Sequence, residues 1–99
     1  MVDPAAGVLT ISLHLPAARN LKEKRAVLRP ILTISRDRYA VAAAEVGEQD
    51  KWQRTTLAFA AVAASYGHVE EVLDAVERFV WSRPGIEVIE TRRSFIDCA

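Results

Sequence analysis

The chain is poor in the residues that build disulfide scaffolds, metal sites and flexible loops. Its 99 residues include one cysteine, two histidines, four glycines and four prolines. Because Cys98 stands alone, no disulfide can form within the chain, which is typical of a reducing cytoplasm. The chain has no apolar run of about 20 residues that could span a membrane, and from the composition of its first residues we expect no signal peptide. We therefore expect a cytoplasmic protein that does not enter the membrane.

Neither sign of charge predominates in this sequence. Thirteen Lys and Arg residues balance thirteen Asp and Glu residues, so the formal net charge is zero. This balance argues against a protein that coats nucleic acid over its whole surface, but it leaves a local basic patch possible. Since 51% of the residues are hydrophobic, the chain can bury a core and disorder is not expected. We expect one domain over residues 1–99, with an ordered core of about 7–96.

Hydrophobic periodicity divides the chain into strands and helices. Alternating apolar residues predict strands, and a 3.6-residue period predicts helices. Residues 1–6 are predicted to form a loose leader, an irregular segment ahead of the first strand. The predicted order is a strand over 7–15, a helix over 21–37, strands over 39–46 and 54–64, a helix over 68–82 and a strand over 86–96. Pro30 is expected to kink the first helix, and the alternation slips near Val88 and Ile89, as a β-bulge would cause.

This order, β-α-β-β-α-β, predicts an α+β protein. Right-handed crossovers place both helices on one face of a four-stranded antiparallel sheet, which is the ferredoxin-like arrangement. The segment between the second and third strands suits an antiparallel hairpin.

The first helix opens on the segment Asn20-Leu21-Lys22-Glu23-Lys24-Arg25, in which Asn20 and Glu23 have the spacing of a capping box. Its last five residues resemble the LKEKR signature of the YlxP-like family of small bacterial proteins of unknown function. Three further segments agree with that family in order and spacing: Leu13 to Pro16, Ala44 to Val46 with Gln49 to Arg54, and His68 to Leu73. Pro30 departs from many members.

The resemblance to the YlxP-like family implies a ferredoxin-like fold. The family's genes often lie near genes for ribosome maturation and translation initiation, which implies a role around ribosomal RNA. The family has no established activity, so the resemblance implies no catalytic residue and no cofactor.

Four cations of the first helix fall on one side of a helical wheel. Lys22, Arg25, Arg29 and Arg36, here called the basic stripe, lie within about 60° of one another at 100° per residue. Such a stripe could bind phosphates, and the alternative is a solvated basic face. Lys24 falls instead on the apolar side, where we expect its stem to pack and its ammonium group to reach outward.

The polar connection between the second and third strands contains a second candidate site. It includes Trp52 and Arg54, a pairing common at interface hot spots and on surfaces that stack nucleobases. One interpretation is packing or a dimer contact, and the other is contact with a ligand or RNA beside the basic stripe.

The sheet face away from the helices, here called the open face, is expected to be small and nearly uncharged. By strand parity it includes Thr10, Ser12, Ala58 and Ala60. An RNA-recognition module would place stacking aromatic residues here, and none is present. A flat face of small, uncharged side chains is often covered by another sheet, so we expect a homodimer. The alternative is that the face simply remains in contact with water.

Catalytic chemistry has little support in the sequence. His14 and His68 lack partners at metal-ligand spacing, and no glycine-rich phosphate loop is present. Glu45, Glu48 and Asp50 could hold a metal, but loop carboxylates are usually solvated. We therefore expect no catalytic, metal-binding or cofactor-binding residues. The sequence favours a non-enzymatic factor that contacts ribosomal RNA or an assembling ribosome. The alternative is a dimeric protein-interaction or small-ligand regulatory module that uses the open face.

Overall fold

A computed structural model describes residues 3–97 of the chain, so Cys98 lies outside the described residues. The element order is the predicted one. It comprises β1 (Ala5–His14), α1 (Leu21–Tyr39), β2 (Ala42–Gly47), β3 (Arg54–Ala63), α2 (Tyr66–Trp81) and β4 (Glu87–Asp97).

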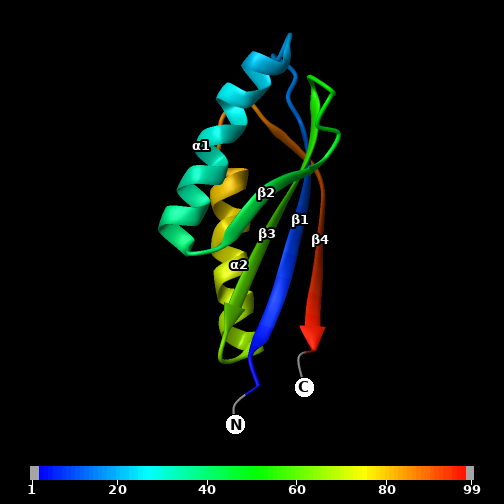
Figure 1. The fold of residues 1–99 in the computed structure, drawn as a ribbon. Helices are drawn as coiled ribbons and strands as arrows, with labels where there is room; N and C mark the ends of the chain where they lie inside the picture. Colours follow the sequence, from blue (N-terminus) through cyan, green and yellow to red (C-terminus); the bar gives the residue numbers. More distant parts are fainter. Residues whose placement is uncertain (1–2, 98–99) are drawn as a thin grey trace.

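The four strands form one sheet in the order β2-β3-β1-β4, with every neighbouring pair antiparallel. Both helices lie on the same face of this sheet, and the molecule is elongated along the strands (Figure 1). These features confirm the ferredoxin-like α+β prediction. None of the helices among residues 3–97 is long and apolar enough to cross a membrane.

The core lies between the sheet and the two helices. On β1 the alternation is complete, because Leu9, Ile11 and Leu13 are fully buried while the residues between them are half-buried. The same core includes Leu57 and Phe59 of β3, Leu28 and Ile31 of α1, and Val69, Leu73 and Val76 of α2. Burying these side chains supplies the main driving force for folding, at about 1.5–3 kcal/mol for each large one.

Several predicted element boundaries are wrong. The loose leader over 1–6 is wrong for Ala5 and Ala6, because both lie in β1 and Ala5 is buried. The predicted strand start at Tyr39 is wrong because α1 continues to that residue. Ala40 ends the helix with a φ of 54°, in the left-handed region, and its N–H donates to the Arg36 carbonyl. No glycine marks this stop in the sequence.

The helix starts follow from their capping residues. Asn20 Oδ1 accepts a 2.8 Å hydrogen bond from the Glu23 N–H, as the capping-box spacing predicts. Ser65 Oγ caps α2 in the same way, so that helix begins at Tyr66 rather than at His68. Pro30 is half-buried inside α1, and the helix continues on both sides of it.

The predicted bulge in β4 is confirmed. The pairing of β1 with β4 shifts between Ser12 and Leu13, which face Glu90 and Val88, so Ile89 is the extra residue. Beyond the bulge, Arg93 points to the helix side, where its Nη2 lies 2.8 Å from Asp74 Oδ1 and 3.4 Å from Glu77 Oε1 of α2. Two of the acidic residues of α2 therefore hold the helix against β4.

Candidate functional site

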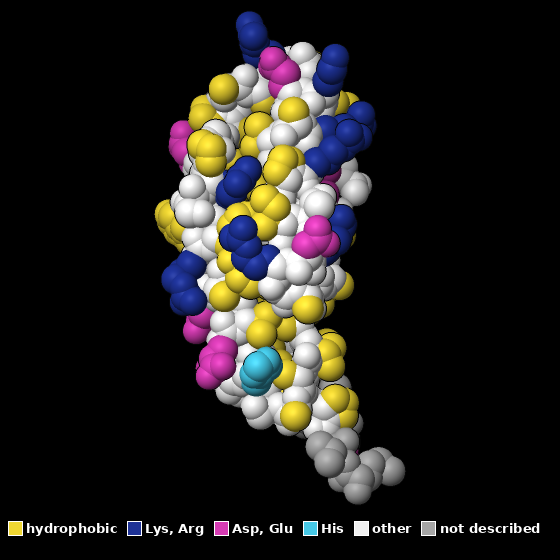
Figure 2. Space-filling model, turned by 90° about the vertical axis from the view of Figure 1, so that its left-hand side faces the viewer, with side chains coloured by type: hydrophobic (Ala, Val, Ile, Leu, Met, Phe, Trp, Pro, Cys, Tyr) yellow, Lys and Arg dark blue, Asp and Glu magenta, His cyan; other side chains and the backbone are white. Residues whose placement is uncertain are grey.

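Three cations of the basic stripe are available on the surface of α1. Lys22, Arg25 and Arg29 are exposed, and within residues 3–97 none of them forms an ion pair or a side-chain hydrogen bond. Figure 2 views the molecule from the side on which α1 lies in Figure 1, and it shows Lys and Arg side chains spread over this face, with acidic side chains scattered among them from top to bottom. The surface can therefore contact an anion without breaking an internal bond.

Arg36, the fourth member of the basic stripe, has a structural partner. Its Nη2 donates a 2.6 Å hydrogen bond to the Ala43 carbonyl of β2, an edge strand of the sheet. An edge strand presents unpaired backbone groups, and a charged side chain laid across them protects the edge. The wheel places Arg36 correctly on the helix, and one nitrogen of its exposed guanidinium group is engaged with β2.

The prediction that the Lys24 ammonium reaches outward is wrong. Lys24 is 1% exposed, and its Nζ lies 2.8 Å from Glu45 Oε2 at the end of β2. The same Nζ donates a 2.7 Å hydrogen bond to the Glu48 carbonyl. A buried ammonium group needs such partners, because an unpaired charge in the interior costs several kcal/mol or more. The helical wheel placed the stem on the apolar side but could not place Glu45, which lies far along the sequence.

The group formed by Lys24, Glu45, Thr55 and the Glu48 carbonyl, here called the Lys24 clamp, joins α1 to the β2–β3 connection. Thr55 is buried, and its Oγ1 donates a 2.6 Å hydrogen bond to Glu45 Oε2. Glu48 has a φ of 56°, and its carbonyl also accepts the Lys51 N–H at 3.1 Å. The register of β2 with β3 shifts at this point, between Glu45 and Gly47. The clamp therefore fixes the strained start of the connection that contains Trp52.

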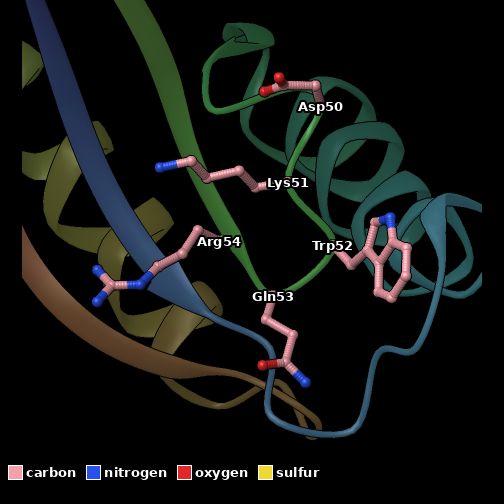
Figure 3. A pocket seen from close by; sticks show the side chains of 5 residues that line it. All are labelled: Asp50, Lys51, Trp52, Gln53 and Arg54. Atoms are coloured by element: carbon pink, nitrogen blue, oxygen red, sulfur yellow. The ribbon is translucent and has the colours of Figure 1, made fainter.

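The β2–β3 connection is also tied to the segment that leads into α1. The Leu15 N–H donates to the Gln53 carbonyl at 2.9 Å, and Gln53 Nε2 lies 3.2 Å from both the Pro16 and the Ala18 carbonyls. Trp52 is 53% exposed. Figure 3 shows Trp52 pointing away from the side to which Lys51 and Arg54 extend.

The structure separates Arg54 from the basic stripe. Arg54 faces His14 in the pairing of β1 with β3, and His14 alternates with the buried Leu13 and Leu15. Cross-strand partners share a face, so Arg54 belongs to the open face, whereas α1 covers the other side of the sheet. The expectation that Arg54 lies beside the stripe is therefore wrong. The alternation of side chains along the predicted strands already indicates, from the sequence alone, that Arg54 lies on the open face.

The open face has the predicted members. Thr10 faces Ala58, Ser12 faces Thr56, and Ala60 faces Val8, all on the side away from the helices. The small side chains leave a shallow apolar depression lined by Val8, Ala42, Ala43, Ala44, Ala58 and Ala60. Val62, the next residue of β3 on this face, is 74% exposed.

Among residues 3–97, the carboxylates and histidines do not gather into a ligand set. Glu45 is engaged by Lys24, and Glu48 lies 3.3 Å from Lys51 Nζ. His14 and His68 each have one carboxylate nearby, from Glu87 at 3.6 Å and Glu71 at 4.0 Å. In the part of the chain that the structure describes, no three His, Cys, Asp or Glu side chains are placed to hold a metal ion.

Comparison with known proteins places the chain in a family. The family model described as "Protein of unknown function (DUF503)" matches residues 6–93, nearly the whole described chain. The chain belongs to this DUF503 family. A curated relative, "Uncharacterized protein YlxP" of Bacillus subtilis (strain 168), is 47% identical over 75 residues, which cover 76% of this chain and 82% of the relative. The YlxP resemblance of the sequence is thereby confirmed.

A solved structure supports the fold of this DUF503 member independently. "De novo designed protein Foldit4" superposes with a TM-score of 0.54 over 93% of this chain and 97% of the designed one, at 13% identity. At that identity the likeness concerns the arrangement of helices and strands alone.

Proposed function

We propose that the protein is a non-catalytic binding factor that contacts the phosphate backbone of ribosomal RNA, free or in an assembling ribosome, through α1. The observation that carries this proposal is the set of three exposed cations, Lys22, Arg25 and Arg29, that have no partner within residues 3–97. They follow one another at spacings of three and four residues, so all three lie on one face of the helix.

The geometry of these cations suits a polyanion better than a small anion. Arg29 follows Lys22 by seven positions, which is about 10 Å along the helix axis. A nucleic-acid duplex carries one negative charge per roughly 1.7 Å of its axis, so several phosphates lie within that span. A single phosphate or carboxylate could neutralise only one or two of the three side chains.

The first turn of α1 supports the same interpretation. The amino end of a helix favours negative charge, so the helix dipole disfavours the positive charges of Lys22 and Arg25. Nearby, Glu23 Oε1 is bound to the Arg19 backbone N–H at 2.8 Å, and it also lies 3.5 Å from Arg19 Nε. Glu23 is thus engaged with Arg19. A bound phosphate would be attracted both by the free cations and by the helix end.

The choice of ribosomal RNA among polyanions rests on the gene neighbourhood that the family resemblance implies. The open face offers no aromatic platform on β1 or β3, so recognition through stacked bases on the sheet is not part of the proposal. Backbone contacts of this kind position a protein on RNA and depend strongly on salt.

The test is equilibrium binding to purified small and large ribosomal subunits and to their extracted RNA. We expect the variant with Lys22→Glu, Arg25→Glu and Arg29→Glu to lose at least about 100-fold in affinity, because each charge reversal removes one phosphate contact and adds a repulsion. A matched control is Arg78→Glu combined with Lys51→Glu, two exposed cations outside the stripe. Equal binding by the triple variant and the wild type would refute the proposal.

A further inference from the structure

Trp52 presents an indole ring that the fold leaves without a stacking partner. The side chain is half exposed, and among residues 3–97 no other aromatic ring is stacked with it and no guanidinium group lies over it. Phe79 shows the contrast, because Arg38 and Arg83 both lie over its ring and the side chain is buried. The exposed part of the Trp52 ring is therefore available to a planar group from outside the chain.

The backbone on both sides of Trp52 is held in place. The next residue, Gln53, is bound to the segment ahead of α1 through both its carbonyl and its side chain. Earlier in the same connection, the Lys24 clamp holds the Glu48 carbonyl. A side chain on a fixed backbone loses less conformational entropy on binding than one on a mobile loop. The ring is thus positioned before any partner arrives.

The same contacts place Trp52 beside the amino end of α1. Gln53 Nε2 lies 3.2 Å from the Ala18 carbonyl, just ahead of the start of that helix. Figure 3 shows the Trp52 ring on the side of α1 and of its leading segment. Lys22 and Arg25, two of the cations without a partner within residues 3–97, belong to the first turns of the same helix. An available aromatic ring and available cations therefore meet at one end of α1.

We propose that Trp52 stacks on an unpaired base of the RNA whose phosphates Lys22, Arg25 and Arg29 contact. This inference rests on the proposed function, and it adds the kind of RNA element that is bound. A base inside a duplex is covered on both faces by its neighbours, so the indole ring can reach only an unpaired base. The cations act on phosphates, which paired and unpaired nucleotides both carry. The element is therefore a stem that ends in unpaired nucleotides, with the stem along α1 and the unpaired end at Trp52.

The surroundings of Trp52 favour a nucleotide over an apolar protein surface. The rest of the connection from Gln49 to Arg54 contains no apolar residue. An aromatic hot spot between two proteins is surrounded by packed contacts that exclude water. Proteins that bind single-stranded nucleic acid instead combine a stacking aromatic side chain with a basic surface. Among polyanions, nucleic acids carry both phosphates and planar rings, so the pairing of cations with an indole ring favours nucleic acid on chemical grounds.

The test is equilibrium binding of the full chain to two RNAs that share one stem, the first fully paired and the second with unpaired nucleotides at one end. We expect the wild type to bind the second RNA about tenfold more tightly, which is within the range that stacking of one base contributes. Trp52→Leu should bind both RNAs equally, at the wild-type affinity for the paired one. Trp52→Phe should keep most of the preference, because a phenyl ring still stacks. The matched control is Trp81→Leu at the end of α2, where the side chain is also more than half exposed, and it should bind as the wild type does.

Indole fluorescence reports the stacking directly. With Trp81→Phe as the background, Trp52 is the only tryptophan in the sequence. Its emission should be quenched by the RNA with unpaired nucleotides and much less by the paired one. Circular dichroism verifies that every variant keeps its fold.

The outcomes separate this inference from the proposed function. If the wild type does not prefer unpaired nucleotides, or if Trp52→Leu keeps that preference, the stacking contact is overturned while the phosphate contacts stand. Self-association that is lost in Trp52→Leu with RNA binding unchanged would assign the ring to a protein contact and overturn it as well. The variant with all three stripe cations changed to Glu should lose affinity for both RNAs. A wild type that binds neither RNA would refute the proposed function and this inference together.

Discussion

Lys24 Nζ lies 2.8 Å from Glu45 Oε2, so the second lysine of the LKEKR segment is half of an internal ion pair rather than part of a surface patch. The pair connects the first turn of α1 to the end of β2, and the Glu48 carbonyl and Thr55 complete its hydrogen bonds. The two lysines of one short segment thus have different roles. Lys22 faces solvent, and Lys24 holds the β2–β3 connection in place.

Lys24→Met should destabilise the protein by about 3 kcal/mol or more, because it leaves the Glu45 carboxylate without its counter-charge in a largely buried position. Lys22→Met is the matched control, since that side chain is exposed, and it should change the free energy of unfolding by no more than about 0.5 kcal/mol. Urea unfolding followed by circular dichroism measures both. Adding Glu45→Leu to Lys24→Met should restore much of the lost stability. If the two lysine substitutions changed the free energy of unfolding equally, the stabilising role of the Lys24 clamp would be contradicted.

Gly7→Ala should destabilise the protein, whereas Gly67→Ala should not. A Cβ on Gly7 would lie 2.9 Å from Val69 Cγ1 and 3.1 Å from Phe95 Cδ1, so these packed side chains would have to shift. Overpacking of this kind costs roughly 1–3 kcal/mol. Gly67, in the first turn of α2, has no atom within 4 Å of such a Cβ, and alanine there should stabilise the helix by up to about 1 kcal/mol. Thermal unfolding of the two variants should show melting temperatures that shift in opposite directions.

Ser35→Ala should leave stability unchanged or raise it by about 1 kcal/mol. Ser35 is fully buried in α1, and its Oγ has no hydrogen-bond partner among the described residues. Removing an unsatisfied buried hydroxyl recovers its desolvation cost, and alanine favours the helix. The measurement is the urea concentration at the midpoint of unfolding, compared between the wild type and the variant when both transitions have the same slope. A lower midpoint would mean that the hydroxyl has a partner in solution.

Arg29→Ala and Arg36→Ala should separate the two roles within the basic stripe. Arg29→Ala should lower the slope of the logarithm of RNA affinity against the logarithm of salt concentration by roughly 0.7–0.9, with little change in stability. Arg36→Ala should leave that slope unchanged and cost about 1 kcal/mol in stability, because the Ala43 carbonyl loses its partner. The reverse pattern would show that Arg36 is the phosphate contact.

Periodicity was sufficient for the element order and for the inward faces of the strands, because one buried side repeats at every second residue. Leu9, Ile11 and Leu13 are fully buried, as their alternation predicts. The end of α1 was not predictable in this way. Ala40 adopts the left-handed conformation that glycine usually supplies, and an alanine gives no sign of it in the sequence.

A helical wheel of α1 predicts the part of the candidate site that this helix alone supplies. The wheel placed Lys22, Arg25 and Arg29 on one exposed face, and the structure agrees. It could not place partners from other elements. Lys24 binds the Glu45 carboxylate and Arg36 binds the Ala43 carbonyl. Both partners belong to β2, whose position beside α1 depends on the whole fold.

Crosslinking in living cells is the most direct test of the proposed contact between α1 and ribosomal RNA. Protein and RNA are crosslinked in cells that express either the wild type or the variant with Lys22→Glu, Arg25→Glu and Arg29→Glu, and the recovered RNA is sequenced. The account predicts that defined segments of ribosomal RNA are enriched with the wild type and lost with the variant, while both proteins accumulate to the same level. Recovery of the same ribosomal segments with both proteins, or of none with the wild type, would contradict it.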